Sequence, residues 1–229
     1  MNDINFILHD FRSRLPMALG YRLVWTRVTC AACPGKAYRG TDRRLWILDD
    51  DFMALSTSLV SGDPRVREEA LLWKQYMDSD DDRTLHRNAA LAAELASRFC
   101  RVGVDAEMIY SEIVDAPQSL ANPHAGLWCQ QLVRLRPYLQ HVADVDLAPA
   151  ELTPVGFDIC WPDGRHSAIR NPGLERARPE FPGYLNNHCL FPTQELASRF
   201  LDSANSMDYG VLPFCVLAVW APPTGVVPR

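Results

Sequence analysis

Hydrophobic and polar positions follow two different periods along this chain, and the two periods alternate from one end to the other. Apolar residues recur every three or four positions in segments 4–15, 63–77, 82–99, 127–142 and 193–207, which predicts amphipathic helices. Alternation or short apolar runs in 21–28, 45–48, 52–59, 107–114 and 211–220 predict strands. The interspersed pattern predicts an α+β protein with a mixed or antiparallel sheet and packed helices.

Capping residues sharpen three of the helix predictions. Asp63, Asp82 and Thr193 each precede a helical pattern and can accept a hydrogen bond from the unpaired N–H groups of a first turn. Pro64 follows Asp63 at the first helical position, where the missing N–H costs nothing. We therefore expect helices to begin at these three points.

The second half of the chain contains more prolines. Pro137 should kink or interrupt the helix of 127–142. Segments 155–161 and 167–169 are predicted to form a strand pair joined by a turn at 162–164, and 172–182 is predicted to be a loop. The apolar run of 211–220 is typical of a central strand that is covered on both faces.

Composition places the chain among globular proteins outside the membrane. Of 229 residues, 48% are hydrophobic and 22% are charged, enough apolar side chains for a packed core. No apolar run approaches the roughly 20 residues that span a bilayer. The first residues lack the basic and apolar regions of a secretory signal, so we expect a cytoplasmic protein without a membrane partner.

Acidic charge is clustered in two short runs. One consists of Asp49, Asp50 and Asp51, and the other of Asp78, Asp80, Asp81 and Asp82. The net charge of -5 argues against nucleic acid as the main partner, because phosphate binding needs a basic surface. The runs can be solvated turns, they can help to hold a hard cation, or they can meet a basic protein partner.

The C-x-x-C motif formed by Cys30 and Cys33 is the feature of the sequence that most suggests catalytic or metal-binding chemistry. Two thiolates at this spacing can share a zinc ion or cycle as a redox pair. A zinc site needs four ligands, and only the adjacent pair His188 and Cys189 offers further ones, in awkward geometry. A metal- or cysteine-dependent enzyme built on Cys30 and Cys33 is therefore the alternative to a protein without catalysis and without cofactors.

Two further sets of residues permit chemistry without requiring it. Cys129 or Cys189 could pair with a histidine at 124, 166 or 188 as nucleophile and base. The arginines at 165, 170, 176 and 178 surround the proline-rich segment and can bind a small anion or an acidic partner, or simply remain solvated.

An ordered series of short blocks lies in the C-terminal part: 154–159 (PVGFDI), 167–173 (SAIRNPG), 184–191 (YLNNHCLF) and 213–216 (PFCV). The series resembles bacterial proteins with the pattern "GYDV … SxLxNxGY … LNxxGLF … PFxV", which are similar to immunity proteins of contact-delivered toxins. It departs from that pattern at Pro172, before the glycine, and at Cys189, where a glycine is usual.

The resemblance covers about residues 127–220 and implies binding without catalysis. Its motifs look structural, with Gly156 and Asp158 at a strand start and Asn186 before a helix. It implies a cognate protein toxin as partner, one that is basic if it attacks nucleic acid. The acidic runs are then the candidate contacts. We divide the chain into an N-terminal part at 1–115, a C-terminal part at 127–220 and a frayed tail at 221–229.

We predict that the purified protein carries no stoichiometric zinc, because Cys30 and Cys33 have no convincing second pair of ligands. Elemental analysis of protein purified without chelator measures this directly. One equivalent of zinc that disappears in a Cys30→Ser, Cys33→Ser variant would contradict the prediction and favour the enzyme alternative.

Overall fold

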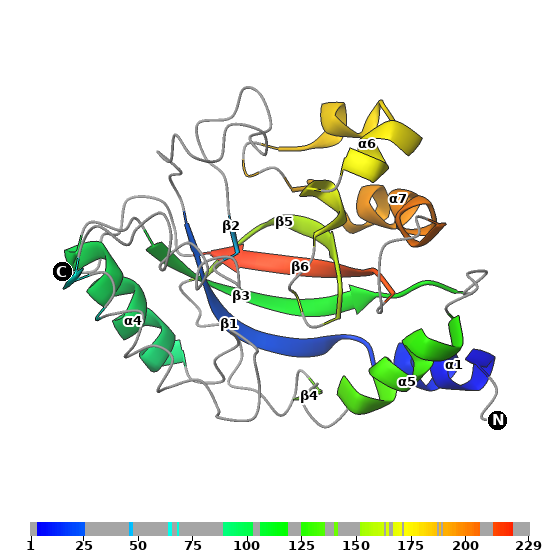
Figure 1. Ribbon diagram of the computed structural model, residues 1–229, viewed down its shortest axis with the longest axis horizontal. Helices are drawn as coiled ribbons and strands as arrows, with labels where there is room; N and C mark the ends of the chain where they lie inside the picture. The colour runs from blue at the N-terminus through cyan, green and yellow to red at the C-terminus, as the bar shows by residue number, and fades with distance from the viewer. Residues whose placement is uncertain are drawn as a thin grey trace.

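An antiparallel sheet forms the frame of the computed structural model (Figure 1). The structure describes residues 4–25, 46–47, 64–65, 68, 89–102, 106–118, 125–135, 140–141, 152–162, 164, 167–170, 172–186, 188, 190–206 and 213–221. Both acidic runs and the C-x-x-C motif lie outside these residues.

The sheet combines strands from both parts of the chain. Its order is β2-β1-β3-β6-β5, with β4 paired to β1 as well. The strands are β1 (Met17–Trp25), β2 (Trp46–Ile47), β3 (Ala106–Asp115), β4 (Gln140–His141), β5 (Thr153–Cys160) and β6 (Cys215–Ala221). Every pair in this sheet is antiparallel. Because β6 lies between β3 and β5, the first and second halves of the chain share one sheet.

Helices cover the sheet from two sides (Figure 1). The elements are α1 (Ile4–Ser13), α4 (Ala89–Arg101), α5 (Ala125–Leu135), η2 (Ala168–Arg170), α6 (Pro172–Ala177), η3 (Phe181–Tyr184) and α7 (Gln194–Ser206). In the view of Figure 1, α6 and α7 lie above the strands, α1 and α5 lie together below them, and α4 lies at the opposite end. The α+β class predicted from the periodicity is confirmed.

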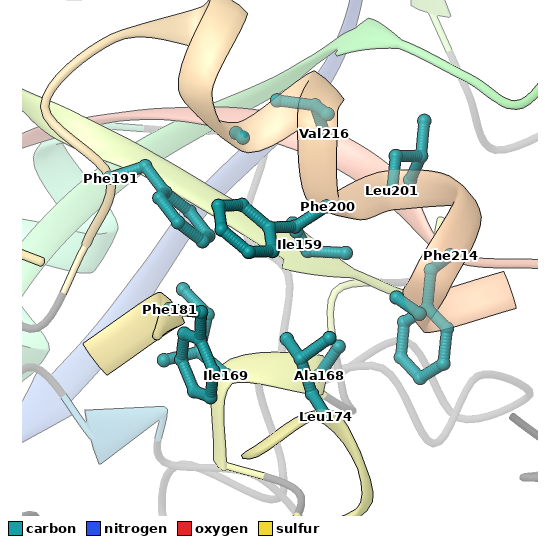
Figure 2. Packing of buried hydrophobic residues seen from close by; sticks show 12 residues of the cluster. Ile159, Ala168, Ile169, Leu174, Phe181, Phe191, Phe200, Leu201, Phe214 and Val216 are labelled. Carbon is teal, nitrogen blue, oxygen red and sulfur yellow. The ribbon is translucent and has the colours of Figure 1, made fainter. Parts of the chain in front are cut away.

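Strand β6 is buried on both faces, as the apolar run of 211–220 predicted. Val216 packs into one cluster, whereas Cys215 and Leu217, which point the other way, pack into another. We call the first the C-terminal cluster; its members are Ile159, Ala168, Ile169, Leu174, Phe181, Phe191, Ala197, Phe200, Leu201, Ala204, Phe214 and Val216 (Figure 2). The second, the helix-pair cluster, is Leu8, Phe11, Met17, Leu19, Ile113, Ala116, Leu132, Cys160, Cys215 and Leu217.

Of three local predictions for the second half, one is right in part and two are wrong. The helix predicted for 127–142 stops at Leu135, in agreement with an interruption at Pro137, but Gln140–His141 then pairs with β1 as a strand. The second strand predicted at 167–169 is only a bridge between Cys160 and Ser167, followed by η2. The predicted loop of 172–182 contains α6 and the start of η3, because proline fits a first helical turn, as Pro172 and Pro182 do.

No helix among the described residues is long and apolar enough to cross a membrane.

Burial of Phe214 in the C-terminal cluster yields a stability prediction. Its side chain is 4% exposed, so Phe214→Ala should lower the free energy of unfolding by about 3–5 kcal/mol through lost transfer energy and a cavity. Phe6→Ala is the matched control, since Phe6 on α1 is 69% exposed and its truncation should cost no more than about 0.5 kcal/mol. Urea denaturation of both variants measures the difference; equal losses would show that Phe214 is peripheral.

Candidate partner-binding surface

The segment between η3 and α7 is held against the outer edge of β5. The backbone groups of Phe157 and Phe191 exchange two hydrogen bonds, 2.8 and 2.9 Å long. The Asn186 side chain holds the loop between η3 and α7 in place. Its amide donates to the carbonyl of Val155 at 2.7 Å, and its oxygen accepts from the backbone N–H of His188 and of Leu190. Asn186 therefore organises a loop, and the helix that the resemblance places after it, α7, begins only at Gln194.

Gly156 makes this close approach possible. Its φ is +146°, a left-handed value that other residues rarely adopt, and β5 shifts register between Pro154 and Gly156. A Cβ atom at Gly156 would lie 2.8 Å from the Leu190 Cβ and from the Phe191 carbonyl oxygen. Only glycine lets the loop and the strand meet at this point.

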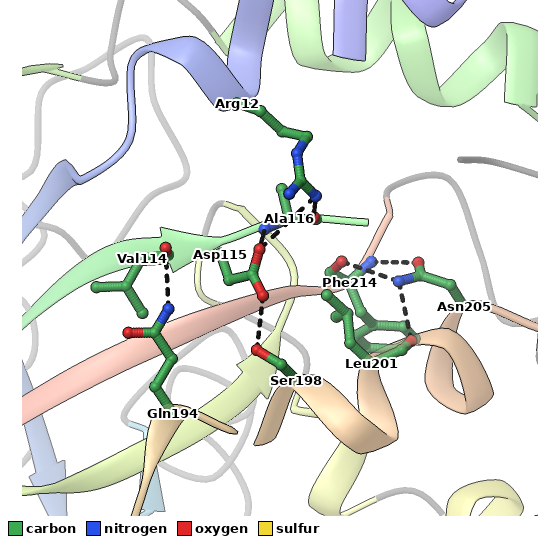
Figure 3. Close-up of polar contacts among 9 residues, drawn as sticks. All are labelled: Arg12, Val114, Asp115, Ala116, Gln194, Ser198, Leu201, Asn205 and Phe214. Carbon is green, nitrogen blue, oxygen red and sulfur yellow. Dashed lines mark hydrogen bonds and ion pairs between the residues drawn. The ribbon is translucent and has the colours of Figure 1, made fainter. Parts of the chain in front are cut away.

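The other blocks of the resemblance also have structural roles. The Ser167 hydroxyl donates to the buried Asp158 carboxylate at 2.6 Å, which joins the first block to the second. Asn205 of α7 satisfies both backbone groups of Phe214: its oxygen accepts from the N–H at 2.8 Å, and its amide donates to the carbonyl at 3.0 Å (Figure 3). Asn205 is buried, so these bonds fix how β6 enters the sheet.

Aromatic rings connect this interior to the surface of η3 and α7. Phe191 and Phe200 stack with their centroids 5.3 Å apart, and Phe181 meets Phe200 edge-on at 6.2 Å (Figure 2). Tyr184 continues the row outward, with its ring 5.8 Å from that of Phe200. Unlike the three phenylalanines, Tyr184 is 38% exposed. One aromatic ring is thus presented at the surface by a rigid, buried support.

Two arginines beside this ring differ in their partners. The Arg178 guanidinium lies 4.7 Å from the Phe200 centroid, and it donates to Glu180 at 2.7 Å and to Ser203 at 3.0 Å. The Arg199 guanidinium lies over the Tyr184 ring at 5.9 Å, and it makes no ion pair with the described residues. A hydrogen bond from its own backbone amide, then Arg178, and then the charge of Arg199 lower the pKa of Glu180. We call Tyr184, Arg199 and the adjoining η3 backbone the Tyr184–Arg199 surface.

A polar joint connects α7 to the N-terminal helix. Asp115, at the end of β3, accepts from the Ser198 hydroxyl at 2.6 Å and from the Ala116 N–H at 2.8 Å (Figure 3). The Arg12 guanidinium lies 3.7 Å from the same carboxylate and also donates to the Ala116 carbonyl. Helices on opposite faces of the sheet are thereby tied to one strand end.

A second group of polar residues lies on the central strand. Burial raises the pKa of the Glu112 carboxyl. The adjacent Tyr110 hydroxyl lowers this pKa, but by less than burial raises it. Burial, and then the Glu112 charge, raise the pKa of Tyr110, whose ring lies between Tyr21 and Trp220 at 5.3 and 5.4 Å. Glu112 pairs with Ala18 on one side and Ala218 on the other, and both alanines are buried. The Glu112 carboxyl therefore lies half-buried on β3, between two strands that carry buried alanines beside it.

The structure places few of the residues that sequence reasoning selected. Asp49, Asp50, Asp51, Asp78, Asp80, Asp81 and Asp82 lie outside the described residues, as do Cys30, Cys33 and Cys189. Cys129 is buried and its pKa is raised by desolvation, which disfavours the thiolate that a nucleophile needs. Within the described part of the chain, no group of three His, Cys, Asp or Glu side chains could hold a metal ion.

Sequence reasoning selected Arg178 and missed Arg199 and Tyr184. Arg178 is held by Glu180, Ser203 and Phe200, so its role is structural. Arg199 reads as one polar position of an amphipathic helix, and Tyr184 as part of a motif. Only the structure shows that the Arg199 guanidinium lies over the Tyr184 ring, which sets these two residues apart from other surface residues. Comparison of the chain with family models, curated proteins and solved structures finds no match.

The contact at Gly156 yields a prediction with a built-in control. Gly156→Ala should lower the free energy of unfolding by about 1–3 kcal/mol, because the new methyl group meets the Phe191 carbonyl and the left-handed φ is strained. Gly126→Ala, in α5 with open space around the added atom, should be neutral or stabilising by up to about 1 kcal/mol. Thermal or urea denaturation compares the two. A neutral Gly156→Ala would show that the loop does not dock on β5 as described.

The raised pKa of Glu112 predicts that replacing this residue increases the stability of the protein in a pH-dependent way. The folded state holds the Glu112 proton more tightly than the unfolded state, so this group's contribution to stability falls as the pH rises past its ordinary pKa. Glu112→Gln should therefore have a higher melting temperature than wild type at pH 8, and the gain should shrink as the pH falls towards 4. Melting curves across this range measure it; a loss of equal size at every pH would contradict the sign.

Proposed function

We propose that this protein is a non-enzymatic immunity protein, which binds a cognate antibacterial toxin and neutralises it. One observation supports the proposal most: the blocks that resemble immunity proteins fold together around β5 and β6. Gly156, Asn186 and Asp158 each serve docking or hydrogen bonding inside that unit. The shared pattern therefore describes a scaffold, as expected for proteins that keep a fold while each binds its own partner.

Charge supports a basic toxin as the partner. The chain carries a net charge of -5 and two acidic runs, Asp49 to Asp51 and Asp78 to Asp82. Adjacent like charges repel one another, and folding alone gives no reason to assemble them. A facing set of arginines or lysines would relieve the repulsion and speed association.

The proposal is tested with the product of the neighbouring reading frame. That protein, or its C-terminal domain, is expressed in a bacterial host with and without this chain. Rescue of growth together with a purified complex is the expected result. Undiminished toxicity and no complex would overturn the proposal.

A kinetic prediction tests the acidic runs. Replacing Asp78, Asp80, Asp81 and Asp82 by Asn should leave the melting temperature nearly unchanged, because exposed charges contribute little to stability. The expected stability rests on the sequence, which predicts a solvated run here. The same variant should bind the toxin more slowly at low salt, and the difference should shrink as salt screens the charges. Association rates at two ionic strengths measure this. Equal on-rates at low salt would show that this run is solvated surface.

A further inference from the structure

We propose that the Tyr184–Arg199 surface anchors a segment of the partner protein that presents a carboxylate. The inference rests on the proposed function for the identity of the partner, and on the described residues for the chemistry. It adds a contact on the C-terminal part to the acidic runs, which lie in the N-terminal part.

Tyr184 has the properties of an interface anchor. Its ring is 38% exposed, yet one side packs against Phe200, which is fully buried. The ring therefore loses little conformational freedom when a partner covers it, and such preorganised tyrosines contribute strongly to binding. Beside it, Gly183 is exposed with nothing within 4 Å of a would-be Cβ, so a partner can approach the backbone closely.

Arg199 determines the charge of the segment that fits. Arg178, on the same surface, is already matched by Glu180 at 2.7 Å. Arg199 has no ion-pair partner among the described residues, although Glu195 and Asp202 lie within one helical turn of it. Glu195 is engaged elsewhere, since its pKa is lowered by its own backbone amide and by the Thr193 hydroxyl of the helix cap. Among the described residues the Arg199 guanidinium acts on Glu180 through its charge but makes no ion pair, so it can still form one with a carboxylate from outside.

The two residues complement each other in one binding event. A carboxylate can lie against the guanidinium edge while a neighbouring apolar group of the same segment covers the Tyr184 ring. On an otherwise basic toxin, an acidic side chain at this point would fix the orientation of the complex. The acidic runs would then act mainly on the rate of association, and this anchor on the rate of dissociation.

The first experiment needs no toxin. Side-chain Nε–H signals of the ¹⁵N-labelled protein are followed by NMR during titration with a short peptide of alternating glutamate and leucine, and with its glutamine counterpart. We expect a saturable shift of the Arg199 signal with the glutamate peptide alone, and little change for Arg178. Tyr184→Ala should weaken this shift several-fold. The absence of any saturable Arg199 shift at peptide concentrations up to ~10 mM would overturn the proposal that this surface binds a carboxylate, whatever the partner is.

The second experiment uses the neighbouring gene product. Tyr184→Ala and Arg199→Gln should each raise the Kd at least tenfold, mainly through faster dissociation. Phe6→Ala and Arg134→Gln are the matched controls, an exposed aromatic on α1 and an exposed arginine on α5, and should stay within twofold of wild type. Arg199→Gln touches no buried group, so its melting temperature should equal that of wild type.

The outcomes separate the two proposals. If wild type binds the toxin and all four variants bind equally well, the Tyr184–Arg199 surface is not part of the interface, while the proposed function stands. If wild type does not bind, the proposed function falls, and the peptide titration alone decides whether the surface binds a carboxylate.

Discussion

Burial of β6 on both faces is the constraint on which the rest of the structure depends. Its alternate side chains enter two separate clusters, one under α7 and one under α1 and α5. Its backbone pairs with β3 on one side and β5 on the other. A strand in that position needs apolar residues at every step, and Cys215–Ala221 supplies them. The two halves of the chain are thereby joined through one segment near the end of the sequence.

Polar side chains then fix the position of that segment. Asn205 satisfies the backbone of Phe214 just before β6 begins, at a place where no water would reach an unpaired group. Asp115 connects the end of β3 to Ser198 and Arg12, so that helices on both faces share one anchor (Figure 3). Hydrophobic burial supplies most of the driving force, whereas these few bonds select one register among several that burial alone would permit.

The same interior prepares the surface that we propose for partner binding. Phe200 stacks on Phe191 in the interior and contacts Tyr184 at the surface, so the exposed ring is held in place by the packed core. Arg178 and Arg199 lie near the same rings, but only Arg178 makes an ion pair with Glu180; Arg199 acts on Glu180 through its charge alone. The proposed contact depends on which charges the fold leaves without an ion pair, and packing determines which these are.

Local periodicity in the sequence predicts the α+β class, the helices that correspond to α1, α4 and α7, and the strands that correspond to β3 and β6. These elements have strong local periodicity, and α7 begins directly after its predicted cap, Thr193. The sequence by itself did not determine β4, α6 and η3, because the two residues of β4 carry no strand pattern of their own and short proline-rich turns take their conformation from what they pack against. The docking loop at Gly156 and Asn186, the pairing of Asn205 with Phe214, and the meeting of Tyr184 with Arg199 were decided by tertiary structure. Each of them joins residues that local spacing does not bring together, and only the assembled sheet and its helices place their atoms within reach.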